Sequence, residues 1–290
     1  MTTALVEATV AWYADNARDL PWRRPDASPW AVLVSELMLQ QTPVARVLPV
    51  HRAWLARWPT PAALAADTPA EAIRMWGKLG YPRRALRLRE CAVAIVERHG
   101  GRVPADVDAL LALPGVGAYT ARAVAVFAFG RREPVVDTNV RRVVARAVDG
   151  QGDAGPPSTR RDLAAVEALL PAEPAQAARA SVALMELGAL VCTARTPRCV
   201  DCPVAVTCAW RRAGCPPYDG PSRPVQRFAG TDRQARGRLL DVLRNNAGPV
   251  SQAALDAAWD SPTQRARALD GLVADGLVDP LPDGRFALPG

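Results

Sequence analysis

Apolar side chains recur at intervals of three and four residues through most of the first 212 residues, and this helical spacing limits the possible folds more than any other feature. Alternating β-branched stretches are few, and proline or glycine marks the short connections. The pattern predicts an all-α architecture for this region. The expected helices cover residues 5–14, 30–41, 43–58, 69–76, 83–99, 107–113, 118–129, 139–148, 161–170 and 177–191.

Proline and glycine are then frequent in residues 213–230, which we interpret as a linker. The segment that follows, residues 231–290, has three positions suited to capping a helix and then a hairpin signal. This order predicts a small C-terminal winged-helix-like domain. The expected caps are Thr231, Ser251 and Ser261, and the hairpin is expected to turn at Asp283-Gly284.

The chain carries 36 basic and 29 acidic residues, for a net charge of +7, and Lys78 is its only lysine. Arginine binds phosphate through paired N–H groups, so this balance suits a nucleic-acid partner. A GC-rich coding sequence produces the same bias, so composition leaves both explanations open. No apolar run reaches the ~20 residues of a membrane span, and no secretory signal is visible, so we expect a cytoplasmic protein with no membrane partner.

Four of the six cysteines lie within residues 192–208. Such clustering in a cytoplasmic chain favours a metal centre over disulfides, and four thiolates suit either zinc or an iron–sulfur cluster. Two arginines of the same loop, Arg195 and Arg198, are candidates for contact with phosphate. The four candidate ligands are Cys192, Cys199, Cys202 and Cys208.

A glycine-rich turn, Leu113-Pro114-Gly115-Val116-Gly117, separates two expected helices. Gly115 and Gly117 would let the backbone approach a phosphate closely, with N–H groups of a helix N-terminus directed at the anion. An ordinary helix–helix turn is the alternative.

Two carboxylates stand in contrasting sequence environments. Glu36 lies in the middle of an almost wholly apolar helix, where desolvation would raise its pKa and suit it to act as a general acid. The alternative is a position on the one solvated stripe of that helix. Asp137 precedes the helix that begins near Thr138, where N–H donors would favour its ionised form, although a plain helix cap has the same pattern. An acid and an anion together suit cleavage of a glycosidic bond.

These residues resemble the A/G-specific adenine DNA glycosylases, the MutY family, within the helix-hairpin-helix superfamily of endonuclease III. The resemblance covers roughly residues 8–212. It rests on Leu20-Pro21-Trp22-Arg23, on Ser35-Glu36-Leu37-Met38-Leu39-Gln40-Gln41-Thr42, on Gly80-Tyr81, on the glycine turn, on Val136-Asp137-Thr138-Asn139-Val140, on Met185-Glu186-Leu187-Gly188-Ala189 and on the spacing of the four cysteines.

The resemblance implies a helix-hairpin-helix DNA glycosylase with a [4Fe–4S] cluster on the four cysteines, and a substrate of double-stranded DNA with a mispaired adenine. It implies a six-helix domain over residues 20–132 that contains the hairpin. A cluster domain would combine residues 1–19 with 133–212. We further expect a monomer that works at the nucleoid.

The same resemblance assigns roles to individual residues. Glu36 would protonate adenine at N7, and Asp137 would stabilise the sugar cation with support from Asn139. Tyr119 would assist catalysis. The remaining assignments are Trp22 and Arg23 in the adenine pocket, and Gln41 and Tyr81 as residues that push into the duplex.

Endonuclease III itself places a catalytic lysine where this chain has Tyr119, so the chain is expected to be a monofunctional glycosylase. Some features depart from the family. Val182 occupies a pocket position that is often Gln or Glu, and residues 231–290 show no counterpart of the family's 8-oxoguanine-reading Nudix-like domain. A relative acting on mispaired thymine or uracil, and a non-catalytic DNA-binding or redox-sensing module, therefore remain alternatives.

The C-terminal segment supports a separate hypothesis. Three arginines of its first expected helix, Arg233, Arg236 and Arg238, lead us to expect contact with DNA from the face opposite the hairpin. A partner-binding or stabilising appendage is the alternative.

Overall fold

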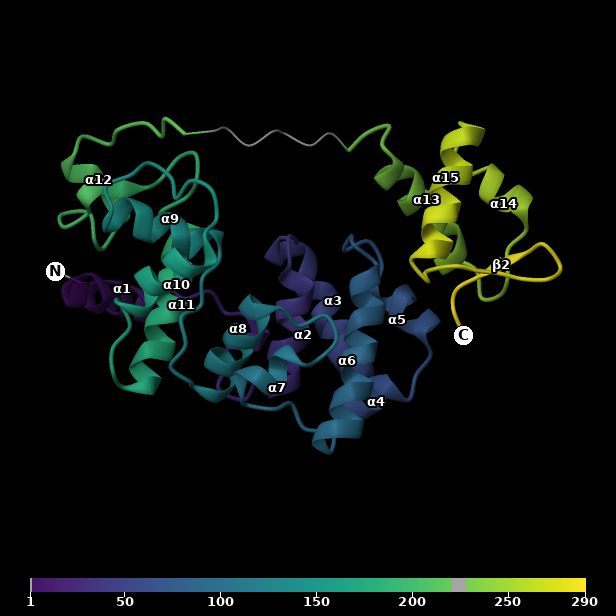
Figure 1. Cartoon of the computed structure of the whole chain (residues 1–290), viewed down its shortest axis with the longest axis horizontal. Helices are drawn as coiled ribbons and strands as arrows, with labels where there is room; N and C mark the ends of the chain where they lie inside the picture. Colours follow the sequence, from purple (N-terminus) through teal and green to yellow (C-terminus); the bar gives the residue numbers. More distant parts are fainter. Residues whose placement is uncertain (1, 221–227) are drawn as a thin grey trace. The chain divides into compact units, whose positions relative to one another are not determined.

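The computed structural model describes residues 2–220 and 228–290, and helices form nearly all of its regular structure (Figure 1). Every helix that the sequence predicts is present. In chain order they are α1 (Thr2–Asn16), α2 (Pro29–Leu39), α3 (Val44–Arg57), α5 (Pro69–Trp76), α6 (Arg83–His99), α7 (Val107–Leu111), α8 (Ala118–Phe129), α9 (Thr138–Ala147), α10 (Thr159–Glu167) and α11 (Pro174–Leu190).

Two short helices within this region were not predicted, α4 (Pro61–Ala65) and α12 (Ala209–Arg212). Both are shorter than two turns, so neither shows a helical period in the sequence. The N-cap of α4 is nevertheless readable, because the Thr60 hydroxyl accepts the Ala63 N–H at 3.2 Å and Pro61 occupies the first helical position. None of the described helices is long and apolar enough to span a membrane.

The described residues form two compact units. The expected domain boundaries divide the chain elsewhere, because they assign residues 20–32 and 117–132 to the six-helix domain, whereas the first unit contains both stretches. The first unit contains residues 2–32, 105–111 and 117–220, and the second contains residues 33–104, 112–116 and 228–290.

The first unit has its core among α1, α9, α10 and α11, where Leu5, Val140, Leu184 and Leu187 are buried. Helices α9 and α11 approach each other closely at Gly188. A β-carbon at this position would lie 2.8 Å from Cβ of Asn139, so only glycine fits there without displacement.

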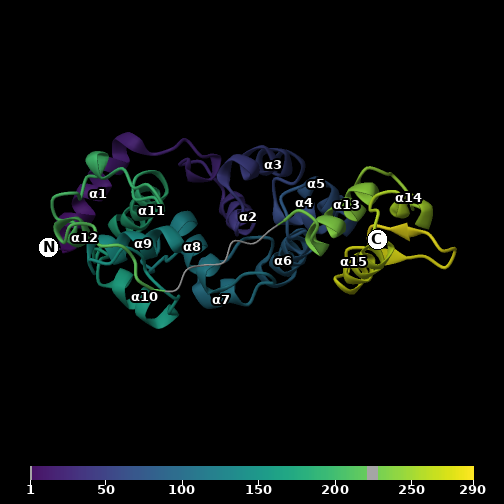
Figure 2. The same cartoon turned by 90° about the horizontal axis from the view of Figure 1, so that it is seen from above.

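The second unit is built around α6, against which α4 and α5 pack (Figure 1, Figure 2). Three fully buried tryptophans, Trp54, Trp58 and Trp76, fill its centre. The Trp54 ring lies edge-on to the rings of Trp58 and Trp76, with centroids 4.6 Å and 5.8 Å apart.

The C-terminal segment has the predicted order of elements. Ser251 and Ser261 cap their helices through hydroxyl groups that accept backbone N–H bonds. Thr231 is the N-cap of the first helix of the segment, without a hydrogen bond from its side chain to the helix. The strands pair antiparallel, and Gly284 turns between them with φ +80°. The elements are α13 (Asp232–Arg244), α14 (Gln252–Asp256), α15 (Pro262–Ala274), β1 (Asp279–Pro280) and β2 (Phe286–Ala287).

The described start of the expected linker packs against the first unit. The Trp210 indole N–H donates to the Pro216 carbonyl at 2.7 Å. A β-carbon on Gly152 would lie 2.9 Å from the backbone nitrogen of Tyr218, so these two segments are in close contact. Residues 221–227 of the expected linker lie outside the described residues.

Candidate functional site

Glu36 lies in the middle of α2 and is only 5% exposed. Its neighbours along the helix, Leu33, Val34, Leu37 and Met38, are each at most 1% exposed. The predicted burial of Glu36 is therefore confirmed, and the alternative of a position on a solvated stripe is wrong. An ionisable group in such a position is a candidate for proton transfer.

Arg84 secures the end of the same helix. One guanidinium nitrogen donates to the carbonyl oxygens of Leu37, Met38 and Gln40 at 3.0, 3.1 and 2.6 Å. The other donates to the Gly80 carbonyl at 3.1 Å. Burial lowers the pKa of Arg84 to about 10, so it remains a cation at neutral pH and neutralises the negative end of the helix dipole. Sequence reasoning did not single out this residue.

Gln41 and Tyr81 were both predicted to contact the duplex, and the structure brings them together. The Tyr81 hydroxyl donates to Oε1 of Gln41 at 2.9 Å, and Tyr81 is 47% exposed. Both residues have left-handed backbones, with φ +55° at Gln41 and +49° at Tyr81. Such conformations are uncommon for residues other than glycine and concentrate at functional positions.

Asp137 is the N-cap of α9. One carboxylate oxygen accepts the backbone N–H groups of Asn139 and Val140 at 2.9 and 2.7 Å, and the other accepts the Asn139 side-chain amide at 2.8 Å. These donors stabilise the anion as predicted. Burial has the larger effect, however, and raises the pKa of Asp137 above its ordinary value, so the donors reduce this shift without reversing it.

Asn139 is itself held by Arg142, which sequence reasoning missed. The Arg142 guanidinium donates to Oδ1 of Asn139 at 2.8 Å and to the carbonyl oxygens of Gly188 and Cys192, each at 2.6 Å. The spacing of three residues places Arg142 and Asn139 on one side of α9, which was the available signal. A chain of hydrogen bonds thus joins Asp137 to the backbone of the first cysteine.

Arg23 and Trp22, the predicted pocket residues, lie in a short 3₁₀ turn, Pro21–Arg23. Trp22 is 5% exposed, and Nη1 of Arg23 lies 2.8 Å from the Glu186 carboxylate, which is fully buried. Arg18 donates to the same carboxylate at 2.8 and 2.6 Å. Although burial opposes ionisation, the two arginines hold the pKa of Glu186 at about 2.

The remaining predicted residues have simple local settings. Gly115 has φ +77°, whereas Gly117 is the extended N-cap of α8. Tyr119 is half-buried in the first turn of α8 and packs against the small core of Ala123, Val126 and Val135. Arg195 and Arg198 are both exposed.

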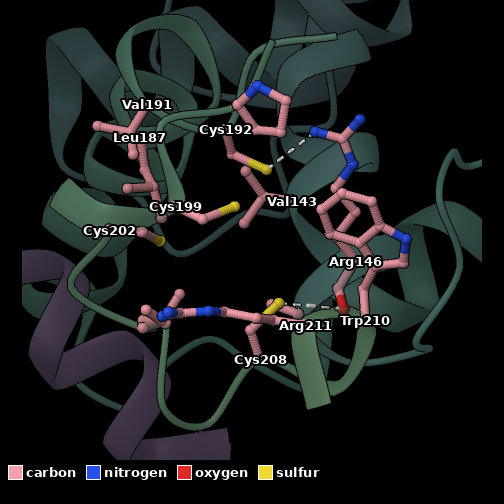
Figure 3. Close-up of a pocket in the computed structure, with 14 residues that line it drawn as sticks. Val143, Arg146, Leu187, Val191, Cys192, Cys199, Cys202, Cys208, Trp210 and Arg211 are labelled. Atoms are coloured by element: carbon pink, nitrogen blue, oxygen red, sulfur yellow. Dashed lines mark hydrogen bonds between the residues drawn. The ribbon is translucent and has the colours of Figure 1, made fainter. Parts of the chain in front are cut away.

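The four predicted cysteine ligands line one cavity of the first unit (Figure 3). The four side chains are spread along the loop from Cys192 to Cys208 and line a common space together with Val143 and Leu187. Burial raises the pKa of the Cys202 thiol to about 11. Among the residues that the structure describes, no three His, Cys, Asp or Glu side chains are gathered closely enough to hold a single metal ion.

Arg146 borders this cavity and fixes the loop around it. Its guanidinium donates to the carbonyl oxygens of Gly152, Thr193 and Ala194 at 2.9, 2.7 and 3.0 Å. It also lies 3.5 Å from the Cys192 sulfur and 4.8 Å from the ring centroid of Trp210 (Figure 3). This side chain places a positive charge directly beside a thiol.

Comparison with known sequences gives a consistent picture. Residues 34–167 match the family described as HhH-GPD superfamily base excision DNA repair protein. An adenine DNA glycosylase from Mycobacterium tuberculosis is 62% identical over 97% of this chain and 92% of its own length. A thymine/uracil-DNA glycosylase from Pyrobaculum aerophilum is 37% identical over 70% of this chain and 89% of its own.

Solved structures support the same fold. A thermostable thymine-DNA glycosylase superposes with a TM-score of 0.65 at 26% identity, over 73% of this chain and 97% of the other. An endonuclease III in a non-covalent DNA complex reaches 0.61 at 23% identity, over 72% and 94% of the two chains. Because the identity to the adenine-specific relative is high and extends over nearly the whole chain, this protein belongs to the adenine DNA glycosylases, in the helix-hairpin-helix superfamily of base excision repair proteins.

Proposed function

We propose that the chain is a monofunctional glycosylase that hydrolyses the N-glycosidic bond of adenine mispaired with 8-oxoguanine or guanine in double-stranded DNA. The observation that carries this proposal is the 62% identity to an adenine DNA glycosylase over 97% of the chain. The burial of Glu36 among apolar side chains supports the same chemistry.

Glu36 is the proposed general acid. It gives its proton to N7 of adenine, so that the base can leave with the electron pair of the C1′–N9 bond. The sugar is then an oxocarbenium-like cation; water adds its hydroxyl group at C1′, and its remaining proton restores the carboxyl group of Glu36. The water-poor setting of α2 supports this role because a proton donor must hold its proton until the bond breaks.

Asp137 is the proposed anion that stabilises the sugar cation. Its carboxylate is fixed by two backbone N–H groups and by Asn139, which is oriented in turn by Arg142. A charge held in advance by such donors does not need to reorganise when the cation forms. Tyr119, in the first turn of α8, is proposed to assist this step.

Adenine must leave the stack before either carboxyl group acts on it, at a cost of a few kcal/mol. We assign the opening of the duplex to the exposed pair Gln41 and Tyr81, and the adenine pocket to Trp22 and Arg23. The strained backbones of the first pair and the fixed Arg23–Glu186 ion pair support these roles.

Backbone phosphates are proposed to bind at the glycine turn and at the cysteine loop. Gly115, with its left-handed backbone, and Gly117, at the N-terminus of α8, would present N–H groups to an anion. The exposed side chains of Arg195 and Arg198 would add phosphate contacts from the loop.

A [4Fe–4S] cluster on Cys192, Cys199, Cys202 and Cys208 is the proposed cofactor. Four thiols around one cavity provide the donor set that such a cluster takes. The cluster would brace the loop that carries Arg195.

The proposed reaction stops at base release. Cleavage of the strand through a Schiff base needs a side-chain amine, and Lys78 is the only lysine of the chain. Tyr119 stands at the position where the endonuclease III resemblance would place that amine. A borohydride-trapped adduct through a side-chain amine, with strand nicking as fast as base release, would contradict this part of the proposal.

Single-turnover base release from a set of mispaired duplexes tests the proposed function. The purified full-length protein should release adenine opposite 8-oxoguanine and opposite guanine, and should leave undamaged A:T pairs intact. Faster release of thymine from T:G than of adenine from A:G would overturn the substrate assignment.

That outcome would favour a second candidate, a glycosylase for mispaired thymine or uracil. It is supported by the 37% identity to a thymine/uracil-DNA glycosylase and by Val182, where adenine-specific proteins often carry Gln or Glu. The lower identity places it behind the first proposal.

Three further assignments complete the proposal. The three helices and hairpin of residues 231–290 are interpreted as a winged-helix-like domain. The protein is expected to be a monomer, since one chain supplies all the proposed catalytic and cluster residues. Its proposed location is the cytoplasm, at the nucleoid where its substrate is found.

A further inference from the structure

Within the second unit, the C-terminal segment contacts α5 and the residues that follow it, up to Tyr81. The contacts combine backbone hydrogen bonds with ion pairs, so the attachment is largely polar. In chain order they join Ala70 to Pro289 (3.0 Å), Arg74 to Asn246 (3.1 Å) and Lys78 to Asp241 (3.5 Å).

Asp275 also holds the two parts together. One of its carboxylate oxygens lies 3.1 Å from Arg83 of α6, and the other pairs with Arg236 of α13. All three side chains are partly exposed, and a single carboxylate shared by two guanidinium groups fixes their relative position. Because Arg236 is engaged in this way, it is unsuited to the DNA contact that was predicted for it.

The Arg83 end of this contact lies on the same face of α6 as the glycine turn. A β-carbon on Gly115 would lie 2.9 Å from Cβ of Arg87, which is one helical turn from Arg83. The ion pair with Asp275 and the contact with the glycine turn therefore involve residues one turn apart on α6.

The contacts made by Asp275 bring the first turn of α13 close to the exposed ring of Tyr81. The guanidinium carbon of Arg233 lies 5.9 Å from the Tyr81 ring centroid, and that of Arg84 lies 5.3 Å from it. The Tyr81 hydroxyl is at the same time bonded to Gln41. The ring of a half-exposed side chain is thus surrounded by two cations and one hydrogen bond.

We propose that Arg233 is a positioning residue for Tyr81. The C-terminal segment, held in place by the ion pairs of Asp275, thereby takes part in opening the duplex. The proposal rests on the role of Tyr81 in base opening given above. A side chain that enters a base stack must keep its rotamer while the bases pack against it. A cation close to its ring favours that rotamer.

Fluorescence of 2-aminopurine tests this proposal without depending on catalysis. The probe replaces adenine opposite 8-oxoguanine, and its emission rises when it leaves the stack. Full-length Arg233→Ala should lower the extrusion equilibrium about two- to fivefold at saturating protein, as expected for loss of one exposed cation–π contact. Arg233→Lys should restore most of it, and Asp275→Asn should reproduce the defect.

Arg238→Ala is the matched control, because it removes an exposed arginine from the same helix without altering the contact to Tyr81. Its extrusion equilibrium should equal that of wild type. Thermal unfolding of each variant checks that the C-terminal segment remains folded, and only folded variants are compared.

Two results would overturn the proposal. In one, Arg233→Ala extrudes the probe as well as wild type. In the other, it only weakens binding and lowers the salt dependence by about one ion, as a simple phosphate contact would. Binding by wild type with no rise in emission would instead overturn the base-opening role of Tyr81 on which the proposal rests.

Discussion

Glu36 and Asp137 carry the same functional group in opposite kinds of surroundings. Glu36 is set among apolar side chains of its own helix, each at most 1% exposed. Asp137 is set at a helix N-terminus, where three N–H groups converge on its oxygens. Burial of a carboxyl group opposes its charge, whereas the N–H donors around Asp137 stabilise charge at a fixed point.

With the proposed roles, these two settings would give one chain an acid and an anion from two carboxyl groups at one pH. Helix-cap geometry alone does not determine ionisation, however. Although its donors oppose the shift, burial still raises the pKa of Asp137.

The strongest test of the acid is Glu36→Gln, which keeps the shape of the side chain and removes its proton. We expect base release to fall by about 10²- to 10⁴-fold, the usual contribution of a general acid. Single-turnover kinetics on an A:8-oxoguanine duplex measures this. DNA affinity should be unchanged, and full activity in this variant would remove Glu36 from the mechanism.

The anion is tested by Asp137→Asn, which removes the charge and keeps a capping oxygen. Base release should fall about 10²-fold, as for loss of a preorganised electrostatic group. Unfolding free energy should change little, because Asn caps a helix about as well as Asp. Asp137→Ala should cost a further ~1 kcal/mol of stability, and equal activity of wild type and Asp137→Asn would make Asp137 a cap only.

A third carboxylate, Glu186, extends the comparison because two arginine side chains hold it, together with the backbone N–H of Arg18 at 3.0 Å. Its pKa of about 2 in the folded protein lies below the ordinary value of 4.5, so its stabilisation is full above pH 4.5 and lost as pH falls towards 2. The loss should approach about 3 kcal/mol.

The measurement is urea unfolding of wild type and Glu186→Gln between pH 7 and the acid limit of folding. Wild type should lose stability faster than the variant once pH falls below about 5. Parallel pH profiles of the two proteins would show that the two arginines do not stabilise the ionised form of Glu186.

The smallest effect is expected from Gly188→Ala. The new methyl group would lie 2.8 Å from Cβ of Asn139, so we expect about 1–3 kcal/mol of destabilisation by overpacking. Because Asn139 bonds Asp137, base release should fall as well. Gly237→Ala is the control, since nothing lies within 4 Å of its added methyl group and a helical alanine should stabilise by about 0.5–1 kcal/mol.

Much of the helical framework could be predicted from apolar spacing, and α5, α6 and α8 have the predicted bounds. Caps such as Ser251 and Ser261 were also readable, because capping depends on a few adjacent residues. Helix α4 was missed because five residues are too few to show a period.

The candidate site was predictable where function depends on residue type and sequence spacing. Glu36, Gln41 and Tyr81 are examples, and the structure confirms the burial of the first and joins the other two. Arg84 and the Glu186 ion pair were not found, because most of their partners lie tens of residues away in the sequence. Arg142 was missed although Asn139 lies only three residues away, and its other partners are backbone carbonyls that are distant in the sequence. Such contacts depend on tertiary packing, which no local pattern encodes.

The five hydrogen bonds of Arg84 have a consequence for the timing of catalysis. They join the end of the helix that carries Glu36 to Gly80, the residue before Tyr81, through one rigid planar group. The spacing between Glu36, the proposed proton donor, and Tyr81, the residue proposed to open the duplex, is therefore set when the protein folds, before any DNA arrives. The entropy of aligning these two side chains is lost during folding, so their relative position does not have to be fixed again when DNA binds.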